Sequence, residues 1–393
     1  MRKIAALIII CCFLLTVTPI SAIAESEFFD TQTSFYANAD IELGENIGAA
    51  YLCESSTGKV IYAKNEFQAA PPASVTKIMT LLLVMEALEE GKFKLDDTVR
   101  VSAKAASMGG SQVFLEEGEK ITVEELIKST VIASGNDSSV ALAELTAGSE
   151  ASFVKMMNSK ANELGLKNTS FENTTGLDDT TSNHYSCAAD IAKMSRELIK
   201  HELILKYSSI WQDTIRNGEF TLTNTNRLVR YYEGCNGLKT GSTDKAGYCI
   251  SATAKRGNMQ LIAVIMGAET RDARNNAARE LLDYGFANYA LYERGEEFIE
   301  KIPVYGGTND FVSIYSKPFS CVVEKSALAK INLEYEIPEC LFAPVLENEK
   351  VGEIIYKIDN EQVGASEIIS LNSSDKITLG NIYLRVIKRM LCG

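Results

Sequence analysis

The segment from Ser74 to Glu90 places the strongest constraint on the fold, because it predicts a helix that is apolar on nearly every face. Its apolar residues are Ile78, Met79, Leu81, Leu82, Leu83, Val84, Met85 and Leu88. Other elements must cover such a helix on all sides, which requires a large hydrophobic core. Gly91 ends the segment. A chain of 393 residues is long enough to build that core, and its length suggests two domains.

Ser74 and Lys77 lie three residues apart at the start of this segment, on one face of the predicted helix. A neutral lysine in that position can deprotonate the serine, which can then attack a carbonyl carbon. The pattern alone is weak evidence, because it recurs in this chain and because a serine before a helix is also a common N-cap. Ser-x-x-Lys also begins at Ser56, Ser152, Ser242 and Ser373.

Two further short motifs give the Ser74 pattern its meaning. Ser134-Gly135-Asn136 follows about sixty residues later, and Lys239-Thr240-Gly241 about a hundred after that. Taken singly, the second could be a helix-ending turn and the third a loop. In this order the three motifs are the signature of serine acyltransferases that recognise penicillin.

Carbonyl chemistry needs a nucleophile, a base, an oxyanion hole and a clamp for the substrate. We expect Ser74 to be the nucleophile and its N–H, at a helix start, to face the developing oxyanion. Lys77 is the expected base, so burial or a nearby cation such as Lys239 must lower its pKa. Ser134 is expected to relay a proton to the leaving group.

The remaining motif residues predict how a substrate is held. Asn136 offers an amide for a substrate backbone carbonyl, and Lys239 can pair with an anionic terminus. Gly241 lacks a side chain, which would let an extended ligand approach the strand edge closely. The backbone N–H of Ser242 can supply the second oxyanion donor.

The hydrophobic periodicity predicts an α+β fold. A hairpin is expected at residues 49–63, and early and late strands can pair into one antiparallel sheet with helices against it. Helical patterns cover Val123–Ala133, Ser138–Ala147, Glu150–Leu164, Cys187–Lys200 and Asn275–Tyr289. Strand patterns cover Phe220–Thr223, Tyr248–Lys255 and Met259–Gly267.

A change of pattern after Tyr292 predicts a small all-β domain. Its strand patterns cover Phe311–Tyr315, Cys321–Glu324, Ile331–Glu336 and Val351–Ile358. The expected organisation is a signal peptide at 1–24, a lead-in at 25–42, a catalytic domain at 43–292, the all-β domain at 293–372 and an amphipathic tail at 373–393.

The N-terminus predicts export. Arg2 and Lys3 precede an apolar run at residues 4–17, and Ala22-Ile23-Ala24 provides a small-residue cleavage site. The formal net charge of −13 becomes −13 − 2 = −15 without this segment, which argues against nucleic acid as a partner.

Cysteines and histidines limit the possible chemistry. Seven cysteines remain after the signal segment, an odd number with scattered spacing, so we expect buried free thiols rather than a disulfide framework. The chain has only two histidines, His184 and His201, which makes a histidine-dependent catalytic triad or a histidine-rich metal site improbable. We expect neither a metal nor an organic cofactor.

The tail contains one apolar helical stripe: Leu379, Ile382, Tyr383, Val386, Ile387 and Met390. Arg385, Lys388 and Arg389 lie largely off that face. The tail is too short and too charged to span a bilayer, and the pattern favours a helix lying on the membrane surface. The alternative is that it packs on the all-β domain.

The chain resembles the low-molecular-mass penicillin-binding proteins, the serine-type D-alanyl-D-alanine carboxypeptidases. The matching blocks run from about residue 47 to residue 289 and are PPASVTKIMT, GGSQVFLEEGE, IASGNDSSVALAE, LGLKNTSFENTTGLDD and GLKTGSTDKAGYC. The resemblance implies a β-lactamase/transpeptidase-like catalytic domain followed by the family's C-terminal all-β domain. It also implies an enzyme on the outer face of the cell membrane, with peptidoglycan stem peptides as substrates and β-lactams as inhibitors.

The same resemblance implies roles for individual residues. Ser74 would be acylated, Lys77 would be the base, and Ser134 and Asn136 would form the second motif. The terminal carboxylate would be bound by Lys239, Thr240 and Gly241, with Arg274 near that subsite.

Two alternatives remain open at this point. A class A β-lactamase usually carries a glutamate in an E-x-x-x-N segment, and residues 168–179 contain no such pattern. A non-catalytic peptidoglycan-binding module would have lost part of the site, whereas all the motif residues are present.

Overall fold

The computed structural model describes residues 41, 43–44, 46–179 and 181–392. The expected signal peptide and almost all of the expected lead-in therefore lie outside the described residues.

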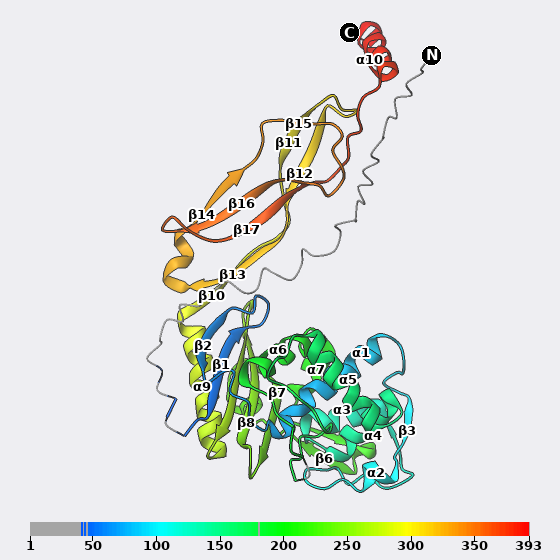
Figure 1. Ribbon diagram of the computed structural model, residues 1–393, viewed down its shortest axis with the longest axis vertical. Coiled ribbons are helices and arrows are strands. Elements are labelled where there is room, and N and C mark those ends of the chain that lie inside the picture. Colours follow the sequence, from blue (N-terminus) through cyan, green and yellow to red (C-terminus); the bar gives the residue numbers. More distant parts are fainter. Residues whose placement is uncertain (1–40, 42, 45, 180, 393) are drawn as a thin grey trace, which may run out of the picture. The chain divides into compact units, whose positions relative to one another are not determined.

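A five-stranded antiparallel sheet forms the centre of the catalytic region, in the order β2-β1-β9-β8-β7 (Figure 1). The strands are β1 (Ala49–Glu54), β2 (Val60–Lys64), β7 (Cys235–Thr243), β8 (Gly247–Arg256) and β9 (Met259–Ala268). The early hairpin and the late strands thus pair as expected, with Tyr51 opposite Val264. β7 occupies one edge of this sheet.

Both faces of the central sheet are covered. Along β9, Ile262 and Val264 join one core while Leu261 and Ala263 join a second core, because successive residues of a strand point to opposite faces. The first core holds helices α1 and α6, and the second holds α9. All four of these β9 residues are buried, which explains why the strand is apolar at nearly every position.

The helical region surrounds α1 on all sides. Ten of its thirteen residues are buried, and they pack in the same core as apolar residues of α3, α4, α5 and α6. The helices are α1 (Lys77–Glu89), α2 (Ala103–Ala106), α3 (Val123–Ile132), α4 (Asn136–Ala147), α5 (Glu150–Glu163), α6 (Ala188–Leu198), α7 (Glu202–Ser208), α8 (Leu228–Tyr231) and α9 (Arg271–Asn288). Two small ribbons pair β3 (Thr98–Arg100) with β4 (Lys120–Thr122) and β5 (Gln212–Ile215) with β6 (Phe220–Thr223).

The expected helices and strands of this region are present, with two differences that matter for the site. α9 begins at Arg271 rather than Asn275, because the Thr270 side chain accepts a hydrogen bond from the Ala273 N–H and caps the helix there. Gly241 was expected at a strand edge, but the full length of β7 was not, since its polar sequence CNGLKTGST has no apolar alternation.

The C-terminal region is all-β, as expected from the sequence. A six-stranded sheet has the order β14-β16-β17-β12-β11-β15, and β10 pairs with β13. The strands are β10 (Tyr289–Arg294), β11 (Glu297–Tyr305), β12 (Phe311–Ser316), β13 (Phe319–Glu324), β14 (Ile331–Glu336), β15 (Leu341–Phe342), β16 (Lys350–Ile358) and β17 (Glu361–Ser370). Its own small core contains Ile302, Ile314, Ile354, Tyr356 and Ile368.

The tail is a helix, α10 (Leu379–Cys392), and Gly380 does not interrupt it. The residues before it belong to the β region, where Val345 bridges Ser374 and Gly307 bridges Lys376. None of the helices in the described part of the chain is long and apolar enough to cross a membrane.

The six cysteines whose side chains the structure describes are free thiols, four of them buried.

Candidate active site

Ser74 lies in a single 3₁₀ turn, Ala73–Thr76, that leads into α1. The preceding Ala73 is buried and has a φ of 48°, a left-handed conformation that costs a non-glycine residue about 1–2 kcal/mol. Strain of this kind persists only where the surrounding structure enforces it, and it is common at functional sites. The turn presents a half-buried Ser74 to a cavity of about 560 Å³.

The Lys77 amine is fully buried and has three neighbours. Its Nζ lies 2.9 Å from Ser74 Oγ, 2.6 Å from Asn136 Oδ1 and 2.9 Å from the Thr175 carbonyl oxygen. A neutral amine has two N–H donors and one lone pair, and the asparagine and carbonyl oxygens can only accept. These two oxygens therefore take both N–H groups and leave the lone pair directed at the Ser74 hydroxyl.

The surroundings of Lys77 favour this neutral form. Burial lowers the pKa of Lys77 well below its ordinary value, and the positive charge of Lys239 lowers it further. Asp137 acts in the opposite direction with a smaller effect, and its carboxylate is held by the N–H groups of Val113 and Leu115. Both causes that the sequence suggested, burial and the charge of Lys239, therefore favour a neutral Lys77 beside Ser74, and its role as the base stays a prediction.

Asn136 has partners other than the expected one. Its Nδ2 donates to the Gly109 carbonyl at 2.7 Å while its Oδ1 accepts from Lys77, and the side chain is buried. It is not among the described residues that line the cavity. Asn136 therefore helps to position Lys77, and its expected contact with a substrate carbonyl stays a prediction.

Ser134 lines the cavity with an unused hydroxyl. Its φ is 63°, and its buried Oγ has no hydrogen-bond partner in the described part of the chain. Lys77 makes no hydrogen bond to it among the contacts above, so the proton relay stays a prediction. An unpaired hydroxyl facing a cavity is available to a bound ligand.

Gly241 is a glycine for a reason that differs from the expected one. A Cβ at this position would come within 2.6 Å of the Ser74 backbone nitrogen and 2.9 Å of the Val75 nitrogen. The edge strand β7 thus packs directly against the nucleophile turn, and no side chain fits between them. The missing side chain thus admits the Ser74 turn, and the expected close approach of a ligand to this strand edge stays a prediction.

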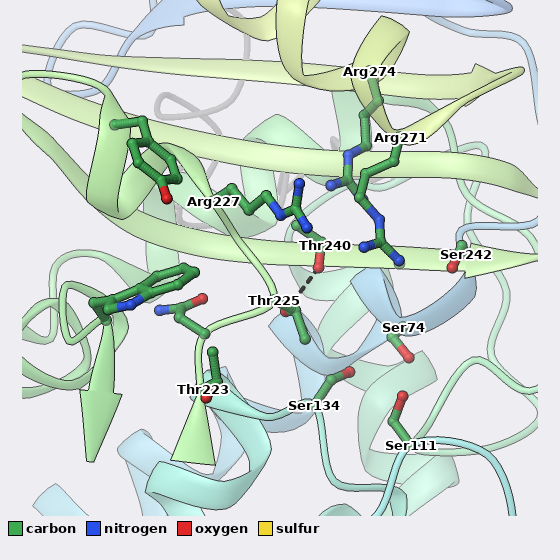
Figure 2. Close-up of a pocket in the computed structure, with 14 residues that line it drawn as sticks. Ser74, Ser111, Ser134, Thr223, Thr225, Arg227, Thr240, Ser242, Arg271 and Arg274 are labelled. Atoms are coloured by element: carbon green, nitrogen blue, oxygen red, sulfur yellow. Dashed lines mark hydrogen bonds between the residues drawn. The ribbon is translucent and has the colours of Figure 1, made fainter. Parts of the chain in front are cut away.

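Lys239, also on β7, is buried next to the cavity. Its Nζ donates to the Thr240 carbonyl at 2.9 Å, and burial, with the nearby charge of Arg274, lowers the pKa of Lys239 to about 7. Thr240 and Ser242 line the cavity itself, and Thr240 Oγ1 donates to Thr225 Oγ1 at 2.8 Å (Figure 2). Lys239 therefore carries a positive charge below about pH 7, and it lies behind the part of the cavity wall formed by Thr240 and Ser242.

Arg274 lines the cavity as the sequence suggested. Its guanidinium donates to Asn275 Oδ1, and burial, followed by the charge of Arg271, lowers the pKa of Arg274 to about 10. Arg271 and Arg227 line the same cavity, and sequence reasoning did not find either one (Figure 2). Arg271 precedes Arg274 by three residues in a helix, a spacing that could have identified it once the helix start was known.

His184 supports the nucleophile turn from behind. Its Nδ1 accepts from the Glu172 N–H at 3.0 Å, so the ring proton lies on Nε2, which donates to Thr76 Oγ1 at 2.8 Å. Burial lowers the pKa of His184 to about 4, which keeps the ring neutral at physiological pH. The sequence offered no signal for this contact, because it joins residues that are 108 positions apart.

Together these groups form a site for acyl transfer. A nucleophilic hydroxyl faces a neutral amine, an edge strand runs beside it, and cations surround the space in front of it. No group of three or more histidine, cysteine, aspartate or glutamate side chains among the described residues could hold a metal ion.

Comparisons with known proteins agree with this chemistry. The profile of the D-alanyl-D-alanine carboxypeptidase family matches residues 39–270, and that of the penicillin-binding protein 5 C-terminal domain matches residues 286–376. The D-alanyl-D-alanine carboxypeptidase DacF of Bacillus subtilis is 43% identical over 96% of this chain and 95% of its own. Penicillin-binding protein 5 of Haemophilus influenzae is similar in structure, with a TM-score of 0.76 and 30% identity over 84% of this chain and 98% of its own. The ampicillin-bound penicillin-binding protein D2 of Listeria monocytogenes has a TM-score of 0.57 and 30% identity over 61% of this chain and 98% of its own.

The charge of Lys239 should set the pH at which Lys77 becomes a base. The rate of acylation by a fluorescent penicillin should fall as the pH drops through the pKa of Lys77, because the protonated amine cannot accept a proton. Lys239→Gln removes the nearby positive charge, so the pKa of Lys77 should rise and the midpoint of this fall should move to higher pH. Lys255→Gln removes one exposed charge from the opposite end of β8 and should leave the midpoint in place. If the pH midpoint of Lys239→Gln is unchanged or lower, the charge of Lys239 does not lower the pKa of Lys77.

Gly241→Ala should displace the nucleophile turn. A shift of about 1 Å in a reacting group can reduce the rate about 100-fold, so penicillin acylation should fall by about that factor. Gly295→Ala is the matched control, because a Cβ at that position meets nothing within 4 Å. Circular dichroism should show both variants folded, and normal acylation in a folded Gly241→Ala protein would contradict the close packing.

Proposed function

This chain belongs to the D-alanyl-D-alanine carboxypeptidase family of serine peptidases, and we propose that Ser74 is the residue with which it removes the terminal D-Ala of peptidoglycan stem pentapeptides. The observation that carries this proposal is the arrangement around Lys77. Two acceptor oxygens fix its N–H groups, so the lone pair of a buried, neutral amine meets the Ser74 hydroxyl at 2.9 Å.

The reaction follows from this geometry in two stages. Lys77 takes the proton of Ser74, and Oγ forms a bond to the carbonyl carbon of the penultimate D-Ala. The N–H groups of Ser74 and Ser242 would stabilise the resulting oxyanion. The carbon–nitrogen bond then breaks, and the proton passes to the amine of the departing D-Ala, for which the unpaired Ser134 hydroxyl offers a route.

The second stage hydrolyses the acyl-enzyme. A water molecule adds to the ester carbon, its proton returns through Lys77 to Ser74, and the shortened peptide leaves. No cofactor is needed for either stage. The terminal carboxylate of the substrate would lie between Thr240 and Arg274, which line the cavity, with the charge of Lys239 behind them.

Penicillins would enter the same site, because a strained amide and a carboxylate replace the two groups that the site binds. The ampicillin complex of the Listeria relative supports this. A β-lactamase of class A would need a carboxylate to activate water, and none of the described residues lining this cavity is acidic. The buried carboxylate of Glu150 does not take this role, because it accepts hydrogen bonds from Thr174 and pairs with Lys104. The complete Ser74–Lys77 pair gives no support to a non-catalytic binding module.

Ser74→Ala should abolish both D-Ala release from a synthetic pentapeptide and labelling by penicillin, while the fold is retained because only a hydroxyl is lost. In the native protein, intact mass should rise by one penicillin adduct that maps to the Ser74 peptide. Ser152→Ala is the control, because Ser152 begins another Ser-x-x-Lys pattern and is exposed on α5. An adduct on any other serine, or D-Ala release by Ser74→Ala, would refute the assignment.

We further propose that the enzyme is exported and works at the outer surface of the cell membrane, held there by α10. The expected signal peptide supports export. The apolar stripe of α10 is largely exposed, with Leu379 at 86% and Met390 at 80%. Exposed Phe342 and Leu346 lie near the Val345–Ser374 bridge that leads into α10. One basic residue of the helix, Arg385, pairs with Asp310, so the apolar stripe is the main support for this proposal.

Removing α10 after Thr378 should release the protein from anionic lipid vesicles, because burying apolar side chains at an interface contributes about 25 cal/mol per Å². Cutting there preserves the bridges made by Ser374 and Lys376. D-Ala release from a soluble peptide should be unchanged. Tyr383→Asp keeps the chain length and should weaken sedimentation with vesicles. If the truncated protein still sediments with vesicles, or unfolds, α10 is a structural part of the β region.

A further inference from the structure

A buried carboxylate lies close to the base, where its charge is unfavourable for catalysis. Asp137 is fully buried at the start of α4, and it forms no ion pair with the described part of the chain. Its negative charge raises the pKa of Lys77, whereas a base must be neutral to accept a proton. A function other than tuning the base must therefore account for a charge at this position.

Backbone N–H groups surround the Asp137 carboxylate. Oδ2 accepts from the Val113 N–H at 2.9 Å and from the Leu115 N–H at 3.1 Å, and Oδ1 accepts from the Ser138 N–H at 2.8 Å. An ionised carboxylate accepts on both oxygens, whereas an asparagine amide would turn its own N–H₂ toward one of these donors. Only a carboxylate can satisfy all three donors at once.

The residues that Asp137 binds belong to a segment that also holds Asn136. In residues 109–115, which we call the wall segment, every second residue contacts the start of α4. The Gly109 carbonyl accepts from Asn136 Nδ2, and the Ser111 carbonyl accepts from the Asn136 N–H, both at 2.7 Å. The wall segment and the start of α4 are therefore joined by the contacts of Asn136 as well as by those of Asp137.

Arg216 holds the wall segment from its other side. Its Nη1 donates to the Val113 carbonyl at 2.9 Å, and its Nη2 donates to the Phe114 carbonyl at 3.1 Å. Between these contacts and those of α4, Ser111 lines the cavity in front of the nucleophile (Figure 2). The wall segment thus forms part of the active-site cavity, and charged side chains hold it on both sides.

We propose that Asp137 is a positioning residue for acyl transfer: its carboxylate fixes the wall segment, the wall segment fixes Asn136, and Asn136 directs the Lys77 lone pair at Ser74. Arg216 secures the same segment from outside. This inference rests on the proposed function, and it leaves the proton transfers and bond changes of the reaction as described above. The unfavourable effect of Asp137 on the pKa of Lys77 is then a consequence of this positioning.

Asp137→Asn separates positioning from electrostatics. A displacement of about 1 Å at a reacting group can lower a rate about 100-fold, so the plateau rate of acylation by a fluorescent penicillin at high pH should fall at least about tenfold. Lys239 and Asp137 are the charges that act on Lys77, so removing the negative one should also move the pH midpoint of acylation down. A lower midpoint with an unchanged plateau would show a purely electrostatic effect and would overturn the proposal.

The turn after β1 provides matched controls, because a buried carboxylate and an arginine hold it in the same way. Glu54 accepts from the Thr57 N–H, and Arg196 donates to the Ser55 carbonyl. Neither is among the described residues that line the cavity. Glu54→Gln and Arg196→Gln should leave the plateau rate and the pH midpoint unchanged. If they lower the plateau as much as Asp137→Asn does, the effect is a general loss of stability and the positioning role fails.

Arg216→Gln tests the wall segment with Asp137 left in place. This variant loses the outer contacts only, so its plateau rate should fall by a smaller factor than that of Asp137→Asn. Circular dichroism should show which variants are folded. If Asp137→Asn does not fold, Arg216→Gln decides the question, and a native plateau rate in that variant would overturn the positioning role of the wall segment.

Hydrogen exchange measured by NMR tests the same chain of contacts without catalysis. In Asp137→Asn, or in Arg216→Gln if the first variant does not fold, the Asn136 N–H should exchange faster because its partner on Ser111 is no longer fixed. Unchanged exchange at Asn136 would overturn the inference. If the native protein is not acylated by penicillin and releases no D-Ala, the proposed function fails, while this exchange measurement still decides whether Asp137 holds Asn136.

Discussion

A lysine amine that has no contact with water organises this active site. Keeping an ammonium charge at the position of Lys77 would cost several kcal/mol of solvation free energy, so the protein holds the neutral form instead. That form has only two N–H groups to satisfy. Asn136 and the Thr175 carbonyl satisfy them, and this pairing directs the lone pair at Ser74. The start of α4 and the loop containing Thr175 must both be in place before Lys77 can act as a base.

The nucleophile turn is held with similar precision. β7 packs so closely on it that only glycine fits at position 241, and His184 supports Thr76 from the other direction. The loop after Asn173 contributes in the same way, since a Cβ at Gly176 would come within 1.8 Å of the Ala73 carbonyl oxygen. These contacts explain how Ala73 is kept in a conformation that alanine rarely adopts.

Positive charge extends from Lys239, next to the neutral amine of Lys77, through Arg274 to Arg271 and Arg227. Each step along this series lowers a pKa, and none of the described residues that line the cavity is acidic and could relieve the repulsion. The free enzyme therefore stores an unfavourable interaction that an anionic substrate removes on binding. The same charges have two functions. Their electric field lowers the pKa of Lys77, and it also attracts the substrate carboxylate.

The sequence by itself determined the α+β class, most helices and strands, and the three motifs that hold the nucleophile, the base and the lysine of β7. Those features depend on local periodicity and on short spacings, which a single chain displays directly. Only the tertiary structure decided what the motif residues contact. It showed that Asn136 holds the base, that Gly241 accommodates the nucleophile turn, that His184 supports it, and that Arg227 and Arg271 face the cavity. The hydrogen bonds of Asn136 and His184 join residues 59 and 108 positions apart, and they depend on how whole elements pack, since no local pattern encodes the partner of a buried hydrogen bond.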